Sequence, residues 1–521
     1  MNNGYKISEE YEKKIDTKFK KYTPQDIARK MLAVSFFRYF KGKKLQKLQK
    51  LKLIDLSCGT GNFLCEALDF LIKMSKIYYG EYKYNESWIT GIDIDKNALE
   101  IANARLNKIL VKYNLPAKKF QLKNKNGLLH NFTKKYNIVI GNPPYLGEKN
   151  NREKFSEIKE SDFGKKYYEG KIDYFYFFIE KGIDILAKNG ILTYITTNYW
   201  LRADYAKKLR KKLKEEVSFF YINNYNKSMF KNAIGQHNMI FALEKKIKNQ
   251  EINVISNSEK FTIKNNEIFN ENQKIILAPE EKILLFKKIK EKSNVKLGEI
   301  LNINQGIVSG CDKGFVLKKY DEKFKKYLKP LYKSKDILHY TTKVENDFWI
   351  LYLDRESVMD ELIEKHLKSF QKRLENRREV KKDIIKWFQL QWCRSQEMFE
   401  MPKIIAKQRG RERLFAYSDK DFYGSADIYY LTPKKENFNL FYILGYLNSK
   451  VFYDWFYYNG KTKGKNLELY STPLKETPIY YPEKEEELEY IANLTKKQIK
   501  NYKIEVQNKI DEYFKNKLLD Y

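Results

Sequence analysis

The feature that most constrains the fold is an alternation of short apolar runs with helical patterns between residues 51 and 245. Composition and spacing predict strands at 51–57, 88–94, 119–123, 136–142, 191–197, 218–224 and 237–243. Helical patterns separate most of these runs, which is typical of a parallel sheet with helices on both faces. Because only a loop separates the last two runs, an antiparallel hairpin is expected at one edge. We therefore predict an α/β domain with a seven-stranded, mostly parallel sheet.

Length and local composition indicate how the chain is divided. With 521 residues it is too long for one ordinary hydrophobic core. The alternation fades after Lys245 into a polar stretch at 252–274, and an amphipathic helix follows near 279–293. We therefore expect a first domain at 1–250, a linker and helix at 251–295, and a mixed α+β domain with a C-terminal helix at 296–521.

The charge balance favours a polyanionic partner. The chain has 100 Lys and Arg residues against 67 Asp and Glu residues, and the formal net charge of +33 is spread along its whole length. Nucleic acid suits such a surface, and the 15% aromatic content supplies rings on which an unpaired base can stack. A lysine-rich coding bias that only keeps the protein soluble is the alternative explanation.

Cysteine usage and hydropathy limit the location. Cys58, Cys65, Cys311 and Cys393 form no CxxC pair and no cluster with histidine, so we expect neither disulfides nor a metal site. The first residues lack an apolar signal segment, and no run approaches the ~20 apolar residues of a membrane span. We therefore expect a soluble cytoplasmic protein with no membrane association.

A glycine-rich turn after the first strand predicts a ligand site. In LIDLSCGTGNF (53–63), Asp55 ends the strand, and Gly59 and Gly61 let the backbone approach a ligand. The next predicted strand ends at Asp93, where a carboxylate can accept both hydroxyls of a ribose. The two carboxylates suit an adenosyl ligand with an amino-acid end better than a dinucleotide, because no GxGxxG turn cradles a phosphate. An ordinary strand-to-helix turn is the alternative.

The sharpest motif is Asn142-Pro143-Pro144-Tyr145, at the end of the strand predicted for 136–142. The prolines fix the backbone and remove two donors, so the loop offers two acceptors, the side-chain oxygen of Asn142 and the carbonyl of Pro143. Two acceptors match the two hydrogens of a planar amino group, and the Tyr145 ring can lie against the base that carries it. The loop therefore indicates catalysis at an exocyclic amino group, with a rigid β–α turn as the alternative.

The order of these motifs resembles a known family. Tyr22-Thr23-Pro24, DLSCGTGNF, GIDID and NPPY, followed by a large C-terminal region, are similar to the TaqI-like, gamma-class DNA methyltransferases that methylate the N6 amino group of adenine. Segments 303–317, 374–392 and 425–430 look most like the CamA branch of stand-alone adenine methyltransferases. The resemblance covers nearly the whole chain. It implies a Rossmann-like, class I S-adenosylmethionine-dependent methyltransferase fold with a C-terminal mixed α+β domain for DNA target recognition.

The resemblance also implies a cofactor and partners. S-adenosyl-L-methionine is the expected methyl donor, S-adenosyl-L-homocysteine the expected product, and double-stranded DNA the expected substrate. We expect a monomer without an obligate protein partner, associated with the nucleoid in a bacterial cytoplasm. It would act either within a restriction-modification system or as an orphan methylase.

Individual residues take roles by matching position. Thr23 and Pro24 would contact the methionine part of the cofactor, although Thr23 can equally cap an ordinary helix start. Asn126 stands where the family has an Asp that accepts a hydrogen bond from the cofactor adenine. Asp173 would line the pocket or cap a helix, and Phe230 would pack on the target base. The residues expected at the cofactor are Tyr22, Thr23, Pro24, Asp55, Ser57, Cys58, Gly59, Gly61, Asp93, Ile94, Asn126, Asn142 and Asp173.

The implied reaction is direct methyl transfer to an extruded adenine. The amino group of a paired adenine is turned inward, so the nucleotide must leave the stack before it reacts. Tyr145 and Phe230 would then sandwich the base while Asn142 polarises its amino group. Because the methyl donor is already activated, we expect catalysis by positioning, without a covalent enzyme intermediate and without a metal.

Other activities remain open. Methylation of the cytosine N4 amino group uses the same chemistry, but that branch usually has Ser in place of Asn142. Protein glutamine methyltransferases and RNA methyltransferases fit the C-terminal half less well. A combined restriction enzyme needs a nuclease domain, and only about twenty residues precede Thr23. A DNA-binding module without activity would have lost Asn142 or the glycine turn, and both are present.

The second half is expected to read DNA. Arginine can bind phosphate or guanine, and glutamine can bind the edge of adenine. Each candidate is also plausible as a solvated surface residue. The candidates are Gln305, Arg377, Arg378, Gln389, Gln391, Gln408, Arg409, Arg411 and Arg413.

Overall fold

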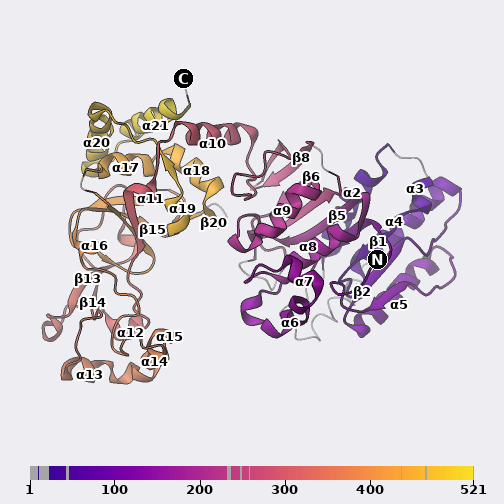
Figure 1. Cartoon of the computed structure of the whole chain (residues 1–521), viewed down its shortest axis with the longest axis horizontal. Coiled ribbons are helices and arrows are strands. Elements are labelled where there is room, and N and C mark those ends of the chain that lie inside the picture. The colour runs from indigo at the N-terminus through magenta and orange to yellow at the C-terminus, as the bar shows by residue number, and fades with distance from the viewer. Residues whose placement is uncertain are drawn as a thin grey trace. The chain divides into compact units, whose positions relative to one another are not determined.

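The chain divides into two compact units, Met1–Glu280 and Glu281–Tyr521 (Figure 1). The computed structural model describes residues 10, 23–42, 46–230, 236–246, 249–256, 258–412, 414–435, 437–463 and 466–519. Among these residues, no helix combines the length and the apolar character needed to cross a membrane. The same residues contain no group of three or more side chains placed to hold a metal ion.

The first unit is built on a nine-stranded sheet with the order β3-β2-β1-β4-β5-β7-β6-β8-β9. Strands β1 to β5 pair in parallel, whereas β7 runs antiparallel to both β5 and β6. All seven predicted strands are present, including the antiparallel hairpin. The bounds are β1 Leu53–Asp55, β2 Ile89–Asp93, β3 Gln121–Asn124, β4 Tyr136–Gly141, β5 Leu186–Thr197, β6 Ser218–Asn224, β7 Asn238–Glu244, β8 Glu251–Ser256 and β9 Glu259–Lys264.

The polar stretch after Lys245 is not a linker, which corrects the expected domain boundary at 250/251. Strand β8 pairs in parallel with β6, and β9 pairs antiparallel with β8. On β8 only alternate side chains, including Ile252 and Val254, are buried. An edge hairpin with one solvated face needs few apolar residues, and its polar face made this sequence resemble a loop.

Helices cover both faces of this sheet. Ile138 and Ile140 of β4 belong to one core cluster with residues of α2, α4 and α5. Val139, whose side chain points to the opposite face, lies against Gly182 of α8. The helices of this unit are α2 Gln25–Phe40, α3 Gln46–Gln49, α4 Asn62–Tyr79, α5 Lys96–Lys112, α6 Arg152–Glu160, α7 Asp162–Tyr167, α8 Tyr174–Ile185 and α9 Lys207–Glu216.

The second unit is a mixed α+β structure. It contains two four-stranded sheets, β11-β19-β15-β17 and β12-β14-β13-β18. Ile405 and Tyr430 of the first of these sheets share a core cluster with Leu331 and Leu351 of the second. The strands are β10 Val295–Lys296, β11 Leu301–Gln305, β12 Val316–Leu317, β13 Leu328–Tyr332, β14 Phe348–Leu351, β15 Lys403–Lys407, β16 Arg409–Gly410, β17 Phe415–Ser418, β18 Tyr423–Gly424, β19 Ile428–Pro433, β20 Lys461–Lys463, β21 Asn466–Glu468 and β22 Pro478–Ile479.

The charged tail of this unit forms two helices, α20 and α21, where the sequence suggested one. Gln498 closes the turn between them, because its side chain both accepts from Lys503 N and donates to Lys503 O. The helices of the unit are α10 Glu280–Lys292, α11 Leu297–Ile300, α12 Asp312–Phe315, α13 Glu361–Leu367, α14 Gln371–Glu375, α15 Arg378–Lys381, α16 Glu397–Glu400, α17 Leu440–Leu447, α18 Lys450–Asn459, α19 Ser471–Lys475, α20 Glu485–Lys500 and α21 Ile504–Leu519.

Candidate active site

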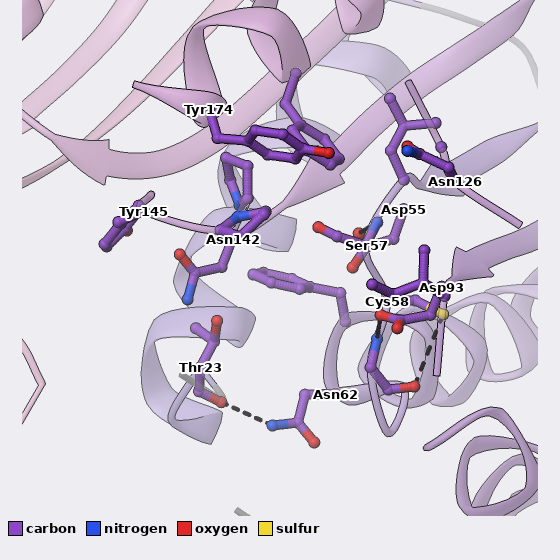
Figure 2. A pocket seen from close by; sticks show the side chains of 18 of the residues that line it. Thr23, Asp55, Ser57, Cys58, Asn62, Asp93, Asn126, Asn142, Tyr145 and Tyr174 are labelled. Atoms are coloured by element: carbon purple, nitrogen blue, oxygen red, sulfur yellow. Dashed lines mark hydrogen bonds between the residues drawn. The ribbon is translucent and has the colours of Figure 1, made fainter. Parts of the chain in front are cut away.

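A cavity lies at the carboxyl ends of β1, β2 and β4. These strands are parallel neighbours, so the loops that follow them meet at one edge of the sheet. Figure 2 shows Asn142 and Tyr145 on one side of the cavity and Asp93 and Asn126 on the other. The residues that line it are Thr23, Asp55, Leu56, Ser57, Cys58, Gly59, Asn62, Phe63, Asp93, Ile94, Lys125, Asn126, Gly127, Asn142, Pro143, Pro144, Tyr145, Tyr174 and Phe178.

Asp55 is a buried carboxyl group at the end of β1. Its Oδ1 accepts a hydrogen bond from Ser57 N at 3.0 Å, and no lysine or arginine among the described residues forms an ion pair with it. Burial, together with the nearby Asp93, raises the pKa of Asp55 to about 8. A methyl group added at Gly141 would lie 2.8 Å from Asp55 Oδ1, so glycine before the catalytic loop lets the two strand ends approach. The site therefore holds a carboxyl group that a ligand cation can stabilise in its charged form.

Asp93, at the end of β2, is held by backbone amides. Its Oδ2 accepts from Gly59 N at 2.8 Å, and its Oδ1 accepts from Asp95 N at 2.9 Å. These two amides fix the orientation of the carboxylate where it lines the cavity. Asp95 caps α5 by accepting from Ala98 N at 3.2 Å.

The two glycines of the first loop have different roles. Gly59 lines the cavity and has a φ of +51°. Gly61, with a φ of +83°, does not line it; a methyl group there would lie 3.0 Å from the Cβ of Ala102 on α5. The expected cofactor contact of Gly61 is therefore replaced by close packing between two helices.

The segment before α2 closes one end of the cavity. The carbonyl of Thr23 accepts a hydrogen bond from Asn62 Nδ2 at 2.9 Å, as Figure 2 shows. Sequence reasoning missed Asn62 and Phe63, although both follow the glycine turn directly. Pro24 is exposed and precedes α2 without lining the cavity, which corrects its assignment to the cofactor. Tyr22 lies outside the described residues.

The loop Asn142–Tyr145 brings all four motif residues to the cavity. Tyr145 donates a hydrogen bond from its hydroxyl to Ile195 O of β5 at 3.1 Å. Burial raises the pKa of Tyr145, so its hydroxyl stays protonated and remains a donor. Phe175 and Phe230 contact the Tyr145 ring edge-on, with ring centroids 5.8 and 6.3 Å away. Phe230 itself is 8% exposed and does not line the cavity.

Asp173 anchors the loop instead of lining the cavity. It accepts hydrogen bonds from Leu146 N at 2.9 Å, from Phe175 N at the start of α8, and from the hydroxyl of Tyr199. Its carboxylate is thereby occupied by the chain itself, and the helix-cap interpretation is the correct one. The contact with Leu146 fixes the backbone directly after Tyr145.

The far side of the cavity is partly apolar. Ile94 is 69% exposed, which is unusual for an isoleucine and makes its side chain available to a ligand. Tyr174 and Phe178 line the cavity from consecutive turns of α8, and an i, i+4 aromatic pair after the catalytic loop was the signal that sequence reasoning missed. Asn126 Oδ1 accepts from Leu128 N at 3.1 Å.

In the second unit, two candidates for DNA contact prove to be internal. The Arg377 side chain is buried and donates to the carbonyls of Leu374, Ser309 and Trp387. Gln389, 2% exposed, accepts from Lys386 N and donates to Arg355 O. The structure therefore contradicts a direct DNA contact for both residues, because their polar atoms already bind the chain.

The other candidates are more accessible. Arg378 and Arg411 are exposed, whereas Arg409 pairs with the buried Glu468. Gln391 donates to Glu379, Gln305 donates to Ala426 O, and Gln408 is half-buried. Arg413 lies outside the described residues.

Comparisons with known proteins give two family matches in separate segments. Residues 87–230 match the Eco57I restriction-modification methylase model, and residues 329–479 match the TaqI-like C-terminal specificity domain. RM.Eco57I of Escherichia coli, a type II restriction enzyme and methyltransferase, is 26% identical over 37% of this chain. The type II methyltransferase M.HincII of Haemophilus influenzae is 35% identical over 23% of this chain. The chain spans 24% of the length of each of these relatives.

A solved structure matches over most of the chain. The Type IIL restriction-modification enzyme MmeI, solved in complex with DNA, superposes with a TM-score of 0.71 at 15% identity. The match covers 95% of this chain and 75% of that one. At this identity the likeness concerns the fold alone. The first unit has the class I methyltransferase fold, and the second is a mixed α+β unit within which residues 329–479 match the TaqI-like C-terminal specificity domain.

Proposed function

We propose that this chain is a site-specific DNA methyltransferase that transfers a methyl group from S-adenosylmethionine to the N6 amino group of adenine in double-stranded DNA. The observation that carries the proposal is that the Asn142–Tyr145 loop lines the same cavity as Asp55 and Asp93. Acceptors suited to an amino group thus share one pocket with carboxyl groups suited to an amino acid and a ribose. The matches to methyltransferases of restriction-modification systems support this chemistry.

The residues present fit S-adenosylmethionine. Asp93 lines the cavity with a carboxylate, the kind of group that accepts hydrogen bonds from ribose hydroxyls. Among the described residues no lysine or arginine pairs with Asp55, and the ammonium group of the ligand would supply that cation. Ile94 and Phe178 offer apolar surface for the adenine ring, with Asn126 as the polar group beside it. When bound, this cofactor supplies a methyl group already activated on a sulfonium.

The catalytic loop would act on the base by orienting it. Asn142 Oδ1 and the carbonyl of Pro143 accept the two hydrogens of the amino group, which localises the nitrogen lone pair towards the cofactor side of the cavity. Tyr145 stacks on the base and is itself fixed by its hydrogen bond to Ile195 O. Because these groups sit in a cavity, the base must be extruded from the duplex to reach them.

The target base and the roles of the two units are proposed from the resemblance seen in the sequence. Asn142, where cytosine-specific enzymes usually have Ser, favours adenine over the N4 amino group of cytosine. We further propose that the first unit is catalytic, that the second recognises the DNA sequence, and that the enzyme acts as a monomer in a bacterial cytoplasm.

The test is to incubate the purified protein with duplex DNA and S-adenosylmethionine and to identify the modified nucleoside by mass spectrometry. N6-methyladenine is the expected product, and long-read sequencing of the same DNA gives the target sequence. N4-methylcytosine as the product would move the assignment to the cytosine branch. A protein that binds both ligands but transfers no methyl group would be a silent DNA-binding module.

A further inference from the structure

Three distant segments meet in the second unit at a groove that no catalytic role explains. They are residues 307–313 and 425–427, which line the groove, and the segment around Trp392, which pairs with Val308 beside it. Val308 and Trp392 exchange two backbone hydrogen bonds of 3.0 and 2.9 Å, and Ile307 N donates to Gly424 O at 2.8 Å. A methyl group at Gly306 would lie 2.4 Å from that same carbonyl, so only glycine permits this approach.

The rim of this groove is cationic. Lys313, Lys333 and Arg373 line it from three different parts of the unit. Its acidic residues are engaged by the chain: Asp427 accepts from Ser334 N and from Ser425, and Asp312 accepts from Ser309. Lys333 also lies 4.0 Å from Asp312, near the limit for an ion pair. Further exposed cations occur at Lys372, Arg378, Lys381 and Lys382, and Figure 1 shows α12, α14 and α15 grouped in this part of the unit.

An exposed aromatic ring flanks the groove. Trp392 is opposite Val308 in an antiparallel bridge, so the two side chains lie on the same side, and Val308 lines the groove. Trp392 is 37% exposed, and the guanidinium of Arg355 lies 5.9 Å from its ring centroid. Cations beside an accessible flat ring are a combination with which proteins hold unpaired nucleotides.

The buried Arg377 holds the loop 308–310, which forms part of the groove. Its guanidinium spans the carbonyls of Ser309, Leu374 and Trp387 at 3.3, 3.0 and 2.7 Å. Gly310, with a φ of +79°, passes directly over it, since a methyl group there would lie 2.9 Å from Arg377 Nη1. One side chain therefore sets the position of the loop that forms the groove.

We infer that this groove is a DNA contact site of the second unit, in which Lys313, Lys333 and Arg373 bind backbone phosphates. Arg377 is a positioning residue that holds the 308–310 backbone in place for contact with the duplex. This inference rests on the proposed function, because it takes DNA as the substrate. It assigns the phosphate contacts to three residues that are not among the DNA-contact candidates named from the sequence.

The first test replaces the three rim cations, Lys313, Lys333 and Arg373, by alanine in the full-length protein. Binding to a duplex of mixed sequence is measured by fluorescence anisotropy between 50 and about 200 mM salt. Each lost phosphate contact should reduce the slope of log K against log salt by about 0.9, and binding at the lower salt should fall about tenfold or more. S-adenosylmethionine affinity should stay unchanged, which shows that the first unit is folded, and an unchanged thermal unfolding curve shows the same for the second unit.

The matched control replaces three exposed lysines of the same unit, Lys484, Lys497 and Lys500, by alanine and so removes the same charge. Its DNA affinity and salt slope should equal those of the wild type. Equal slopes for the rim variant and the wild type would overturn the inference, as would equal losses in the rim and control variants. A wild-type protein that binds no DNA would instead overturn the proposed function.

The second test separates positioning from stability at Arg377. Arg377→Gln should raise the KM for the unmethylated duplex substrate at least about tenfold and reduce discrimination against one-base variants of the target. The KM for S-adenosylmethionine should not change, and Arg377→Lys should restore part of the DNA affinity. A merely structural role would lower kcat in proportion to the folded fraction with both KM values unchanged, and that result would refute positioning.

Discussion

The carboxyl group of Asp55 predicts that cofactor binding is coupled to release of a proton. Burial and Asp93 raise the pKa of Asp55 to about 8, so at pH 7 the ligand-free protein carries this group about nine-tenths protonated. A bound ammonium group favours the charged form, so the carboxyl must lose its proton when the cofactor binds. Binding at pH 7 should therefore release about one proton per cofactor.

The size of the pH effect on cofactor affinity follows from the fraction of Asp55 that is already ionised. Below pH 8 this fraction rises about tenfold for each pH unit, whereas the α-amino group of the ligand stays protonated between pH 6 and 7. Affinity for S-adenosylmethionine should therefore rise about tenfold over that interval. The free energy of unfolding of the ligand-free protein changes in the opposite direction. Between about pH 4 and pH 8 the folded protein keeps the Asp55 proton that the unfolded chain has lost. The ligand-free protein therefore becomes less stable as the pH rises towards 8.

Isothermal titration calorimetry in buffers of different ionisation enthalpy measures the released protons directly. Asp55→Asn is the control, because an amide cannot ionise; it should bind more weakly, release no proton at this site and show no rise between pH 6 and 7. The groups that face Asp55 are Asp93, Cys58 and Tyr194, and burial raises the pKa values of the last two well beyond this interval. Wild-type binding without proton release and without pH dependence would refute the reasoning.

Three further predictions concern the catalytic loop. Asn142→Ala removes one amino-group acceptor, so methyl transfer should fall at least about a hundredfold while both ligands still bind, as radiolabel transfer and titration would show. Tyr145→Phe keeps the ring and should retain most activity, whereas Tyr145→Ala should lose stacking worth about 1–3 kcal/mol; equal activities would exclude stacking. Gly141→Ala places a methyl group 2.8 Å from Asp55 and should weaken cofactor binding, whereas Gly147→Ala, which meets no atom within 4 Å, should not.

The sequence was most informative where function depends on residues next to each other along the chain. Asp55 and Asp93 end predicted parallel strands, and neighbouring parallel strands bring their carboxyl ends to one edge. The Asn142–Tyr145 loop follows such a strand, so its place at the cavity was predictable as well. These placements follow from local order and topology, both of which leave a pattern in the sequence.

The sequence was least informative where burial decides the role of a polar residue. Arg377 and Arg378 are adjacent and chemically identical, yet one is 8% exposed and bonded to carbonyls while the other faces solvent. The partners of Arg377 include Ser309, which is distant in the chain, and no local pattern reveals such a contact. The role of Asp173 was hidden for a similar reason, because its contacts with Leu146 and Tyr199 hold it outside the lining of the cavity.

The two rings proposed to stack on the target base, Tyr145 and Phe230, differ in how well they are placed for it. Two hydrogen bonds fix Tyr145. Its own hydroxyl donates to Ile195 O, and the amide of the next residue, Leu146, donates to Asp173. Phe230 meets the Tyr145 ring at an interplanar angle of 62°, and the centroids are 6.3 Å apart. A base stacked on both rings needs them parallel, with its own thickness between them. Stacking on both rings therefore requires Phe230 to change position while Tyr145 stays in place, so the Tyr145 side is preorganised and the Phe230 side forms around the base.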